Sequence, residues 1–586
     1  RREDRTGRFG EQPISIGLWV GSALSPNSDS DAVNAHKKLQ RDTRASNPFV
    51  INSCPWCGSK MGVVQERPQR VIKGLVHKAK PSRIELRCDA PDCSFSNEDG
   101  LPIHVVDERI YASPPSLLIA TVDKFAMLPW RERNLVGRIF GLDEDSPMPP
   151  SLIIQDELHL ISGPLGSMTG HYETLIDELC KFDEGQRAYG AKIVGSTATI
   201  SRAAEQVAAL YGRRPEQSVL FPPQALSAGD SFFAEEKTGP EYPGRQYVGV
   251  FAPALPSFVT TEVRVLSSLL QSPKLFETED ESLIDGFWTL ITYFNSIREL
   301  GHATTLVDQD IREYLAVLAR RFGLMGGADN PMSTKRRWIN NPLELTSRIS
   351  NDEVTAAISQ LFKPNSDRGA VDICLATNMI QVGIDVSRLG LMAVVGQPKT
   401  TAEYIQATSR VGRSKPGLVV SMLNPGKPRD RSHYEHFRAF HEAIYRNVEP
   451  TSVTPFAVPV RDRALHALII GLARLKHGHS ESSIAPSVAV QEAIEKTILD
   501  RVKLVDPDEL EHVRNAIQRY FEGWDINGPV IFGDVQRNDR FPMMYVAGSD
   551  PSPDWTDFSR PTGTSMRSVD AECEIYLSAL ESYREI

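Results

Sequence analysis

The chain has 586 residues, which is enough for about four domains of ordinary size. Hydrophobic residues make up 41% and charged residues 24%, a balance that excludes a disordered or membrane-embedded chain. The net charge of -10 excludes nucleic-acid binding by bulk charge, so any such contact needs a local basic surface.

The amino-terminal stretch RREDRTGRFGEQ is polar and lacks the apolar core and cleavage site of a secretory signal. No apolar run reaches the roughly 20 residues needed to cross a membrane. We therefore expect a cytoplasmic protein without a membrane partner.

The first part of the chain is predicted to form a parallel sheet covered by helices. A short buried strand is expected over Ile14–Val20, and a cysteine-rich insertion over residues 51–100 separates it from the later strands. The apolar runs at 117–121, 151–155 and 192–196 are each followed by a polar turn and helical periodicity. This alternation is typical of parallel strands joined by helices, so we assign residues 1–50 and 101–215 to a first α/β domain.

A second α/β domain is predicted further along the chain. Residues 216–280 are rich in Pro, Gly and Ser, and we interpret them as a connector with an insertion. A new series of strands and helices occupies residues 281–425, including the runs LITYF, DICLAT and LMAVVG. Residues 426–586 mix helical stretches with turns and are interpreted as a mostly helical accessory region.

A pair of carboxylates follows one of the predicted strands. Asp156 and Glu157, with His159 two residues later, come directly after the apolar run SLIIQ, at the carboxyl edge of the predicted sheet. Phosphoryl chemistry uses such a pair: Asp156 can hold Mg²⁺ through its water shell, and Glu157 can orient and deprotonate the attacking water. Taken alone, an Asp-Glu pair is more often a helix cap or a surface feature.

Polar residues also follow later strands. Thr197 and Thr199 end an apolar run, where their hydroxyls can bond to His159 and relay the state of the nucleotide, although in isolation this segment is a turn. Arg410 and Arg413 lie on or just after a predicted helix and project in nearly one direction. Their permanently charged guanidinium groups suit a γ-phosphate in its transition state, whereas the alternative is a pair of surface arginines.

Together these segments resemble the motifs of superfamily 2 nucleic-acid helicases. DELH at 156–159 resembles motif II, TAT at 197–199 motif III, ATNMIQVGID at 376–385 motif V, and QATSRVGR at 406–413 motif VI. The resemblance spans about residues 117–425. It implies two RecA-like domains, the first incomplete, and ATP hydrolysis with Mg²⁺.

The same resemblance implies roles for further residues. It places Asp385 near the ribose, and it makes Gly383 and Gln406 part of ATP binding or coupling. It also implies contacts with the nucleic-acid strand through residues that resemble motifs Ib, IV and V, namely Thr121, Asn295 and Thr377. Ser409 stands where many relatives carry Gly, which makes the local turn less certain.

The chain contains no phosphate-binding loop of the form GxxxxGK[ST]. Its one Gly-Lys pair, Gly426-Lys427, is followed by Pro428 and cannot open a phosphate-cradling helix. The simplest interpretation is a chain truncated at its amino end, with little or no ATPase activity of its own. The alternative is a pseudo-helicase that serves as a nucleic-acid-binding scaffold.

Four of the seven cysteines form two knuckles, Cys54 with Cys57 and Cys88 with Cys93. Four thiolates at this spacing favour a closed, structural zinc site, and the alternative is a set of unrelated buried thiols. Basic residues between the knuckles either contact nucleic-acid phosphate or form a solvated hairpin face. Cys180, Cys374 and Cys573 are interpreted as isolated thiols.

A wider resemblance rests on DELHLISGPLGSMTGHYE, the inserted knuckles and RDRSHYEHFRAFHEAIYRNVEPTSVTPF. These segments resemble the large helicases of bacterial DISARM antiphage systems, the DrmA type. That resemblance implies DNA as the substrate and a partner protein in a defence complex. A DNA-repair helicase is the alternative within the same enzyme class.

Overall fold

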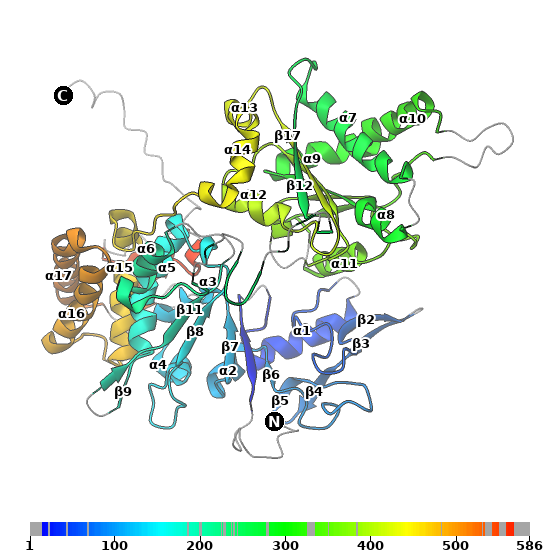
Figure 1. Cartoon of the computed structure of the whole chain (residues 1–586). Coiled ribbons are helices and arrows are strands. Elements are labelled where there is room, and N and C mark those ends of the chain that lie inside the picture. Colours follow the sequence, from blue (N-terminus) through cyan, green and yellow to red (C-terminus); the bar gives the residue numbers. More distant parts are fainter. Residues whose placement is uncertain are drawn as a thin grey trace, which may run out of the picture. The chain divides into compact units, whose positions relative to one another are not determined.

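The computed structural model describes residues 14–21, 24–42, 45–66, 69–184, 187–197, 202–223, 226, 230–235, 237, 239, 241–242, 244–276, 280–324, 335–349, 351–381, 385–481, 483–529, 531–533, 542–549 and 558–567. The chain divides into two compact units (Figure 1). Unit 1 comprises residues 1–197, 202–219 and 451–586, and unit 2 comprises residues 198–201 and 220–450. The chain therefore leaves unit 1, forms unit 2, and returns.

Unit 1 contains two small parallel sheets. Strand β1 (Ile16–Trp19) lies between β6 (Ile103–His104) and β7 (Leu117–Ala120), and β8 (Leu152–Gln155) pairs with β11 (Lys192–Gly195). Each of β1, β7, β8 and β11 falls within an apolar run expected to be a strand. Because all of these pairs are parallel, the polar residues that follow the strands gather at carboxyl edges.

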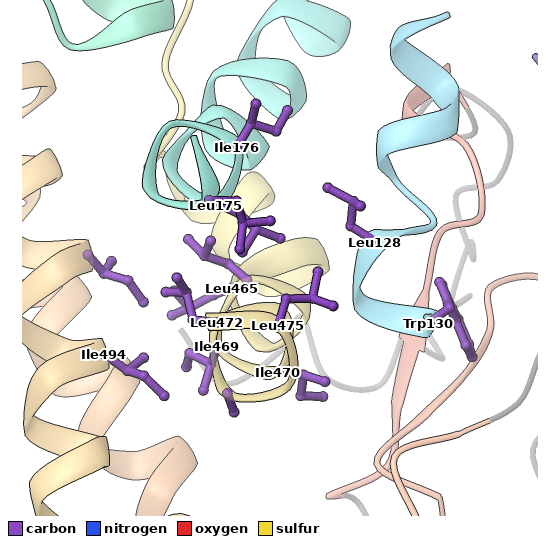
Figure 2. Close-up of a cluster of buried hydrophobic side chains, with 14 of the residues drawn as sticks. Leu128, Trp130, Leu175, Ile176, Leu465, Ile469, Ile470, Leu472, Leu475 and Ile494 are labelled. Carbon is purple, nitrogen blue, oxygen red and sulfur yellow. The ribbon is translucent and has the colours of Figure 1, made fainter. Parts of the chain in front are cut away.

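One face of each small sheet packs against the main core of unit 1. Leu118 of β7 and Ile153 of β8 contact this core, whose other members come from helices far apart in sequence. Those helices are α5 (Gly163–Leu179), α15 (Val458–Gly471), α16 (Val488–Val505) and α17 (Leu510–Asn527). Figure 2 shows Leu175 and Ile176 beside Leu465. Full burial of one such side chain contributes about 1.5–3 kcal/mol, so the carboxyl-terminal helices form an integral part of unit 1.

The opposite face of these strands is apolar and exposed. Its side chains are between 36% and 62% exposed, and they are Ile16, Leu117, Ile119, Leu152, Ile154 and Val194. They lie side by side, because Ile16 pairs with Leu117 and Ile154 pairs with Val194. Parallel strands are normally covered on both faces, so this face lacks a covering layer among the residues that the structure describes.

The cysteine-rich insertion consists of two antiparallel hairpins. Strands β2 (Gly62–Glu66) and β3 (Gln69–Lys73) form one, and β4 (Leu75–Ala79) and β5 (Ser82–Leu86) form the other. Helix α1 (Asp29–Arg41) shares a core with them through Ala32, Val33 and Leu39. The insertion therefore has apolar packing of its own in addition to its cysteines.

Unit 2 is built on a six-stranded parallel sheet in the order β12-β17-β16-β13-β15-β14. Its strands are β12 (Arg245–Phe251), β13 (Leu290–Phe294), β14 (Pro342–Leu345), β15 (Ile373–Ala376), β16 (Leu391–Val395) and β17 (Gly417–Leu423). Every residue of β13, β15 and β16 is buried, as expected for central strands with helices on both faces.

Helices cover both faces of the unit 2 sheet. One face packs against α7 (Phe258–Gln271), α9 (Ile297–Leu306) and α10 (Arg312–Arg321). The other packs against α11 (Asn351–Leu361) and α12 (Thr401–Thr408). Alternate residues divide between the faces, as Leu375 and Cys374 of β15 show. The predicted α/β fold with a parallel sheet is confirmed.

The region expected to be a connector contributes to this sheet. Strand β12 pairs in parallel with β17 along its whole length, and α7 follows it as an amphipathic helix capped by Ser257. The Pro- and Gly-rich stretch directly before it obscured this βα unit in the sequence.

No helix among the described residues is long and apolar enough to cross a membrane.

The remaining helices and strands are shorter or more peripheral. The helices are α2 (Asp107–Ala112), α3 (Val122–Phe125), α4 (Arg133–Val136), α6 (Ala203–Tyr211), α8 (Glu281–Trp288), α13 (Pro428–Glu435) and α14 (Phe437–Glu442). The strands are β9 (Phe182–Glu184), β10 (Arg187–Tyr189), β18 (Met544–Val546) and β19 (Arg560–Thr562).

Candidate functional site

In unit 1 the two carboxylates begin a loop that comes after β8. We call residues 156–161 the carboxylate loop. Asp156 is exposed, and its Oδ1 accepts hydrogen bonds from Ser196 Oγ at 2.5 Å and from the Glu157 amide at 3.0 Å. Ser196 directly follows β11, so the neighbouring strand fixes the aspartate. These bonds orient one carboxylate oxygen and leave the group at the surface, where it can reach a cation.

Glu157 has a backbone conformation that is rare for a residue with a side chain. Its φ of 49° and ψ of 49° lie in the left-handed region, which costs on the order of 1 kcal/mol or more. The Leu158 amide donates to the Ser196 carbonyl at 2.9 Å and holds the loop in this shape. Such strain is concentrated at functional sites, because the surrounding structure must maintain it.

His159 connects the carboxylate loop to the segment after β11. Its Nδ1 lies 3.1 Å from Thr197 Oγ1 and 3.4 Å from Glu157 Oε2. The structure thus brings the histidine of DELH and the first threonine of TAT together, as the sequence predicts. Thr199 lies outside the described residues.

A glutamine that the sequence analysis did not single out also holds this loop. Gln206 of α6 is 3% exposed, and its Nε2 donates to the carbonyls of Leu158 at 3.2 Å and Ile161 at 2.8 Å. A buried side chain with two bonds to one loop restricts the loop strongly. The periodicity of α6 predicts a helix but does not indicate which polar residue faces inward.

Helix α5, which comes after the loop, carries a buried acid. Burial raises the pKa of Glu173 to about 7, although Arg501 and Arg213 act in the opposite direction. Arg213 Nη2 binds Asp177 Oδ1 at 2.6 Å, and Arg501 donates to the carbonyl of Tyr211 at 2.6 Å. This cluster links α5, the end of α6 and α16.

In unit 2 the two arginines lie in a turn after α12. We call residues 409–413 the arginine turn. Helix α12 begins with a capping box between Thr400 and Glu403 and ends at Thr408. Gly412 has a φ of 71°, and a Cβ there would meet the Cα of Gly417 at 2.8 Å, so only glycine fits.

The arginine turn is anchored by its backbone. The amide of Gly412 donates to the carbonyl of Leu389 at 2.8 Å, and Arg245 Nε of β12 donates to the carbonyl of Val411 at 2.9 Å. Ser409 adopts ordinary right-handed helical angles and donates from Oγ to the Gln406 carbonyl at 2.8 Å. Serine is therefore compatible with this turn.

The structure brings Arg413 and Asp385 together. Arg413 forms an ion pair with Asp385 and also donates from Nε to the Ser409 carbonyl at 3.2 Å. The side chains are 33% and 72% exposed, so the pair lies at the surface. Arg410 is half-buried and Gln406 is buried. Gly383 lies outside the described residues.

The three predicted strand-binding residues each come after a parallel strand. Thr121 follows β7, Asn295 follows β13, and Thr377 follows β15. Asn295 donates from Nδ2 to the carbonyls of Val395 at 3.1 Å and Gly396 at 3.3 Å. Thr377 is only 5% exposed. In this structure the side chain of Asn295 therefore joins the ends of two strands.

The four clustered cysteines come together at one point in the insertion. Their Sγ atoms all lie within 4.8 Å of one another, with Cys54 and Cys93 3.9 Å apart and Cys57 and Cys88 3.5 Å apart. Four thiolates about 2.3 Å from a tetrahedral zinc ion are about 3.8 Å apart. The cluster is therefore compatible with zinc.

Comparison with known protein families relates part of unit 2 to helicases. Residues 337–415 match the family model described as the helicase conserved C-terminal domain. This range contains Thr377, Asp385 and the arginine turn. Together with the parallel sheet of unit 2 and the order of the motifs, this match supports the predicted resemblance to superfamily 2 helicases.

The chain is also similar to a protein of a known defence system. It is 36% identical over 615 residues to the DISARM protein DrmA of Bacillus paralicheniformis. The alignment covers 98% of this chain and 53% of that protein, so the chain spans about half the length of this relative. The predicted resemblance to DISARM helicases of the DrmA type is confirmed.

Solved helicase structures show more distant similarity. The DUF1998 helicase MrfA bound to DNA is 14% identical, with 82% of this chain and 52% of that chain covered and a TM-score of 0.44. The helicase Lhr of Mycobacterium smegmatis, bound to single-stranded DNA and AMP-PNP, is 16% identical, with 83% and 48% covered and a TM-score of 0.42.

Proposed function

We propose that the protein is the motor of an ATP-dependent DNA helicase or translocase that acts in antiphage defence in the cytoplasm. The observation that carries this proposal is the strained carboxylate loop, in which Asp156, Glu157 and His159 are fixed by the segment after β11. The similarity to the DISARM protein DrmA supports the defence role. DNA as the substrate and a partner protein in a defence complex are parts of the same proposal.

Asp156 and Glu157 have different tasks in this proposal. Asp156, with one oxygen already oriented by Ser196, binds the water shell of Mg²⁺, which neutralises charge on the phosphates. Glu157 orients the attacking water and accepts its proton. Its position near His159 Nδ1 links the base to Thr197, and through Thr197 to the end of β11.

The arginine turn stabilises the transferring phosphoryl group. Arg410 and Arg413 follow a short helix whose backbone is fixed by neighbouring strands, so their guanidinium groups start from a rigid base. Asp385 binds Arg413 at the surface, and nucleotide binding replaces that contact with a phosphate or ribose contact.

The phosphate-binding loop belongs to a polypeptide layer that covers the exposed face of β1, β7, β8 and β11. The face presents branched apolar side chains in register, which suits helices of an α/β layer. Strand β11 pairs with β8 on one side and has no partner on the other among the described residues, so a parallel strand can add there. About half of the DrmA relative lies beyond the aligned region and leaves room for this layer.

The zinc site is structural in this proposal. The residues Cys54, Cys57, Cys88 and Cys93 hold one Zn²⁺ and fix the two hairpins of the insertion on α1. A four-thiolate site leaves no open coordination position, so the ion takes no part in ATP hydrolysis.

The decisive experiment compares wild type with Glu157→Gln in protein that includes the phosphate-binding loop. We expect Mg²⁺-dependent ATP hydrolysis that single-stranded DNA stimulates, and near-complete loss of turnover with retained nucleotide binding in the variant. Wild-type protein that binds DNA without hydrolysing ATP would support a nucleic-acid-binding scaffold instead.

A further inference from the structure

The last residues of unit 2 hold the amino-terminal end of the helix that presents the arginines. Both carboxylate oxygens of Glu449 accept from the Thr401 amide, at 3.0 and 2.9 Å, and Glu449 Oε1 also accepts from Thr401 Oγ1 at 3.0 Å. Thr401 is 3% exposed and is the first residue of α12. A carboxylate at this position satisfies free backbone donors and complements the helix dipole.

Two residues later, the chain is attached to the carboxylate loop of unit 1. Thr451 donates from Oγ1 to Gln206 Oε1 at 3.1 Å. The other end of the same side chain, Gln206 Nε2, donates to the carbonyls of Leu158 and Ile161. Thr451 is thus one side chain away from the loop that carries Asp156 and Glu157.

The segment after Thr451 is fixed along helix α5. The Gly163 amide donates to the Ser452 carbonyl at 3.0 Å, and the Thr454 amide donates to Ser167 Oγ at 2.9 Å. A Cβ on Gly170 would meet Pro455 Cγ at 2.8 Å. The small residues of α5 therefore allow the close approach of this segment, which holds the chain on α5 directly after Thr451.

The connection between the two anchors is short and stiff. Glu449 and Thr451 are separated by Pro450, whose ring fixes its φ near -65°. The residue before a proline is restricted to extended conformations, so Glu449 has little freedom either. A displacement of Glu449 is therefore transmitted in part to Thr451, since few backbone torsions between them remain free.

We propose that Glu449, Pro450 and Thr451 form a mechanical link that couples the position of α12 and its arginine turn to the carboxylate loop. Glu449, Thr451 and Gln206 are positioning residues in this link, acting through α12 at one end and through Leu158 and Ile161 at the other. The link rests on the proposed ATPase function for its purpose. The coupling itself is testable without ATP.

The first experiment lengthens the link and leaves both anchors intact. Two glycines inserted between Pro450 and Thr451 add about 7 Å of chain at about 3.5 Å per residue. The matched control carries the same insertion between Glu144 and Asp145, two exposed residues of a surface turn in unit 1. Coupling free energies of about 1–3 kcal/mol correspond to about fivefold or more, so we expect the link insertion to lower the DNA stimulation of ATPase at least fivefold.

We expect the link insertion to leave the melting temperature and the nucleotide-free DNA affinity unchanged. The control insertion should keep full DNA stimulation of the ATPase. Thr451→Val should lose part of the DNA stimulation, whereas Thr451→Ser, which retains the hydroxyl, should keep it. DNA stimulation that survives the link insertion would overturn the proposal.

A second readout separates the link from the proposed function. In protein without nucleotide, Glu449→Gln weakens the contact with α12, and we expect faster amide hydrogen exchange at residues 158–161 of unit 1. The glycine insertion should abolish this remote effect. If wild type hydrolyses no ATP but the remote effect is present, the ATPase proposal fails and the link stands; if Glu449→Gln leaves exchange at 158–161 unchanged, the link is disproved.

Discussion

Replacement of Arg413 is expected to slow ATP turnover strongly while changing the stability of the fold very little. Its ion pair with Asp385 is exposed, at 33% and 72% for the two side chains, and exposed pairs contribute about 0–1 kcal/mol. Arg413→Ala should therefore leave the melting temperature almost unchanged. If Arg413 stabilises the transferring phosphoryl group, its removal should slow turnover about a thousandfold, which corresponds to about 4 kcal/mol.

The assay measures ATP turnover with and without single-stranded DNA, in protein that includes the phosphate-binding loop, alongside thermal unfolding and nucleotide-free DNA affinity at one salt concentration. Arg348→Ala is the matched control, because it removes another exposed arginine of unit 2 and its ion pair with Glu344, outside the arginine turn. An Arg413→Ala variant that keeps its DNA-stimulated rate, or that loses DNA binding outright, would refute the assigned role.

Three further predictions concern metal, a buried ion pair and pH. Purified protein should contain one zinc per chain, and removal of the metal should unfold the insertion without unfolding the α/β cores, which circular dichroism and metal analysis can check. Arg337→Leu should cost about 3–5 kcal/mol by denaturant unfolding, because it leaves Asp372, 2.7 Å from Arg337 Nη2, as a buried charge without its cation; Arg337→Leu with Asp372→Asn should cost less. Burial raises the pKa of Glu173 from 4.5 to about 7, so the folded state binds the proton more tightly and stability should fall as pH rises from 4.5 to 7. Glu173→Gln should flatten that dependence, and an unchanged slope would contradict it.

Local sequence patterns predicted the strands and the polar residues that directly follow them, because these features depend on residues close together in the chain. Strands of parallel sheets are often continuous apolar runs, and β8, β13 and β16 all lie inside such runs. Polar residues directly after such strands reach the carboxyl edge of the sheet, which is why DELH and TAT could be expected close together. The contact between His159 and Thr197 follows from the register of β8 and β11.

Contacts between distant segments were not predictable in the same way. Strand β12 was obscured by the Pro- and Gly-rich stretch before it, although it completes one edge of the unit 2 sheet. The sequence does not indicate that residues 451–586 pack into unit 1. The apolar faces of α15 and α16 would fit any core of suitable shape, so their periodicity predicts helices but not the unit to which they belong. Gln206 is one polar residue on an otherwise ordinary helix.

The glycines of α5 are a sequence feature that is related to the packing of the later segment on this helix. A helix with Gly166 and Gly170 in its interior is less stable alone, since each interior glycine costs about 0.5–1 kcal/mol relative to alanine. The structure explains both positions: a Cβ on Gly166 would meet the Ile161 carbonyl oxygen at 2.7 Å and Val453 Cγ2 at 3.0 Å, and one on Gly170 would meet Pro455 Cγ at 2.8 Å. Unfavourable helix formers next to DELH therefore indicate that another segment must pack closely on this helix, even though the sequence alone does not say which. That segment begins at Thr451, which is bound to Gln206, so its packing on α5 also contributes to the position of the carboxylate loop.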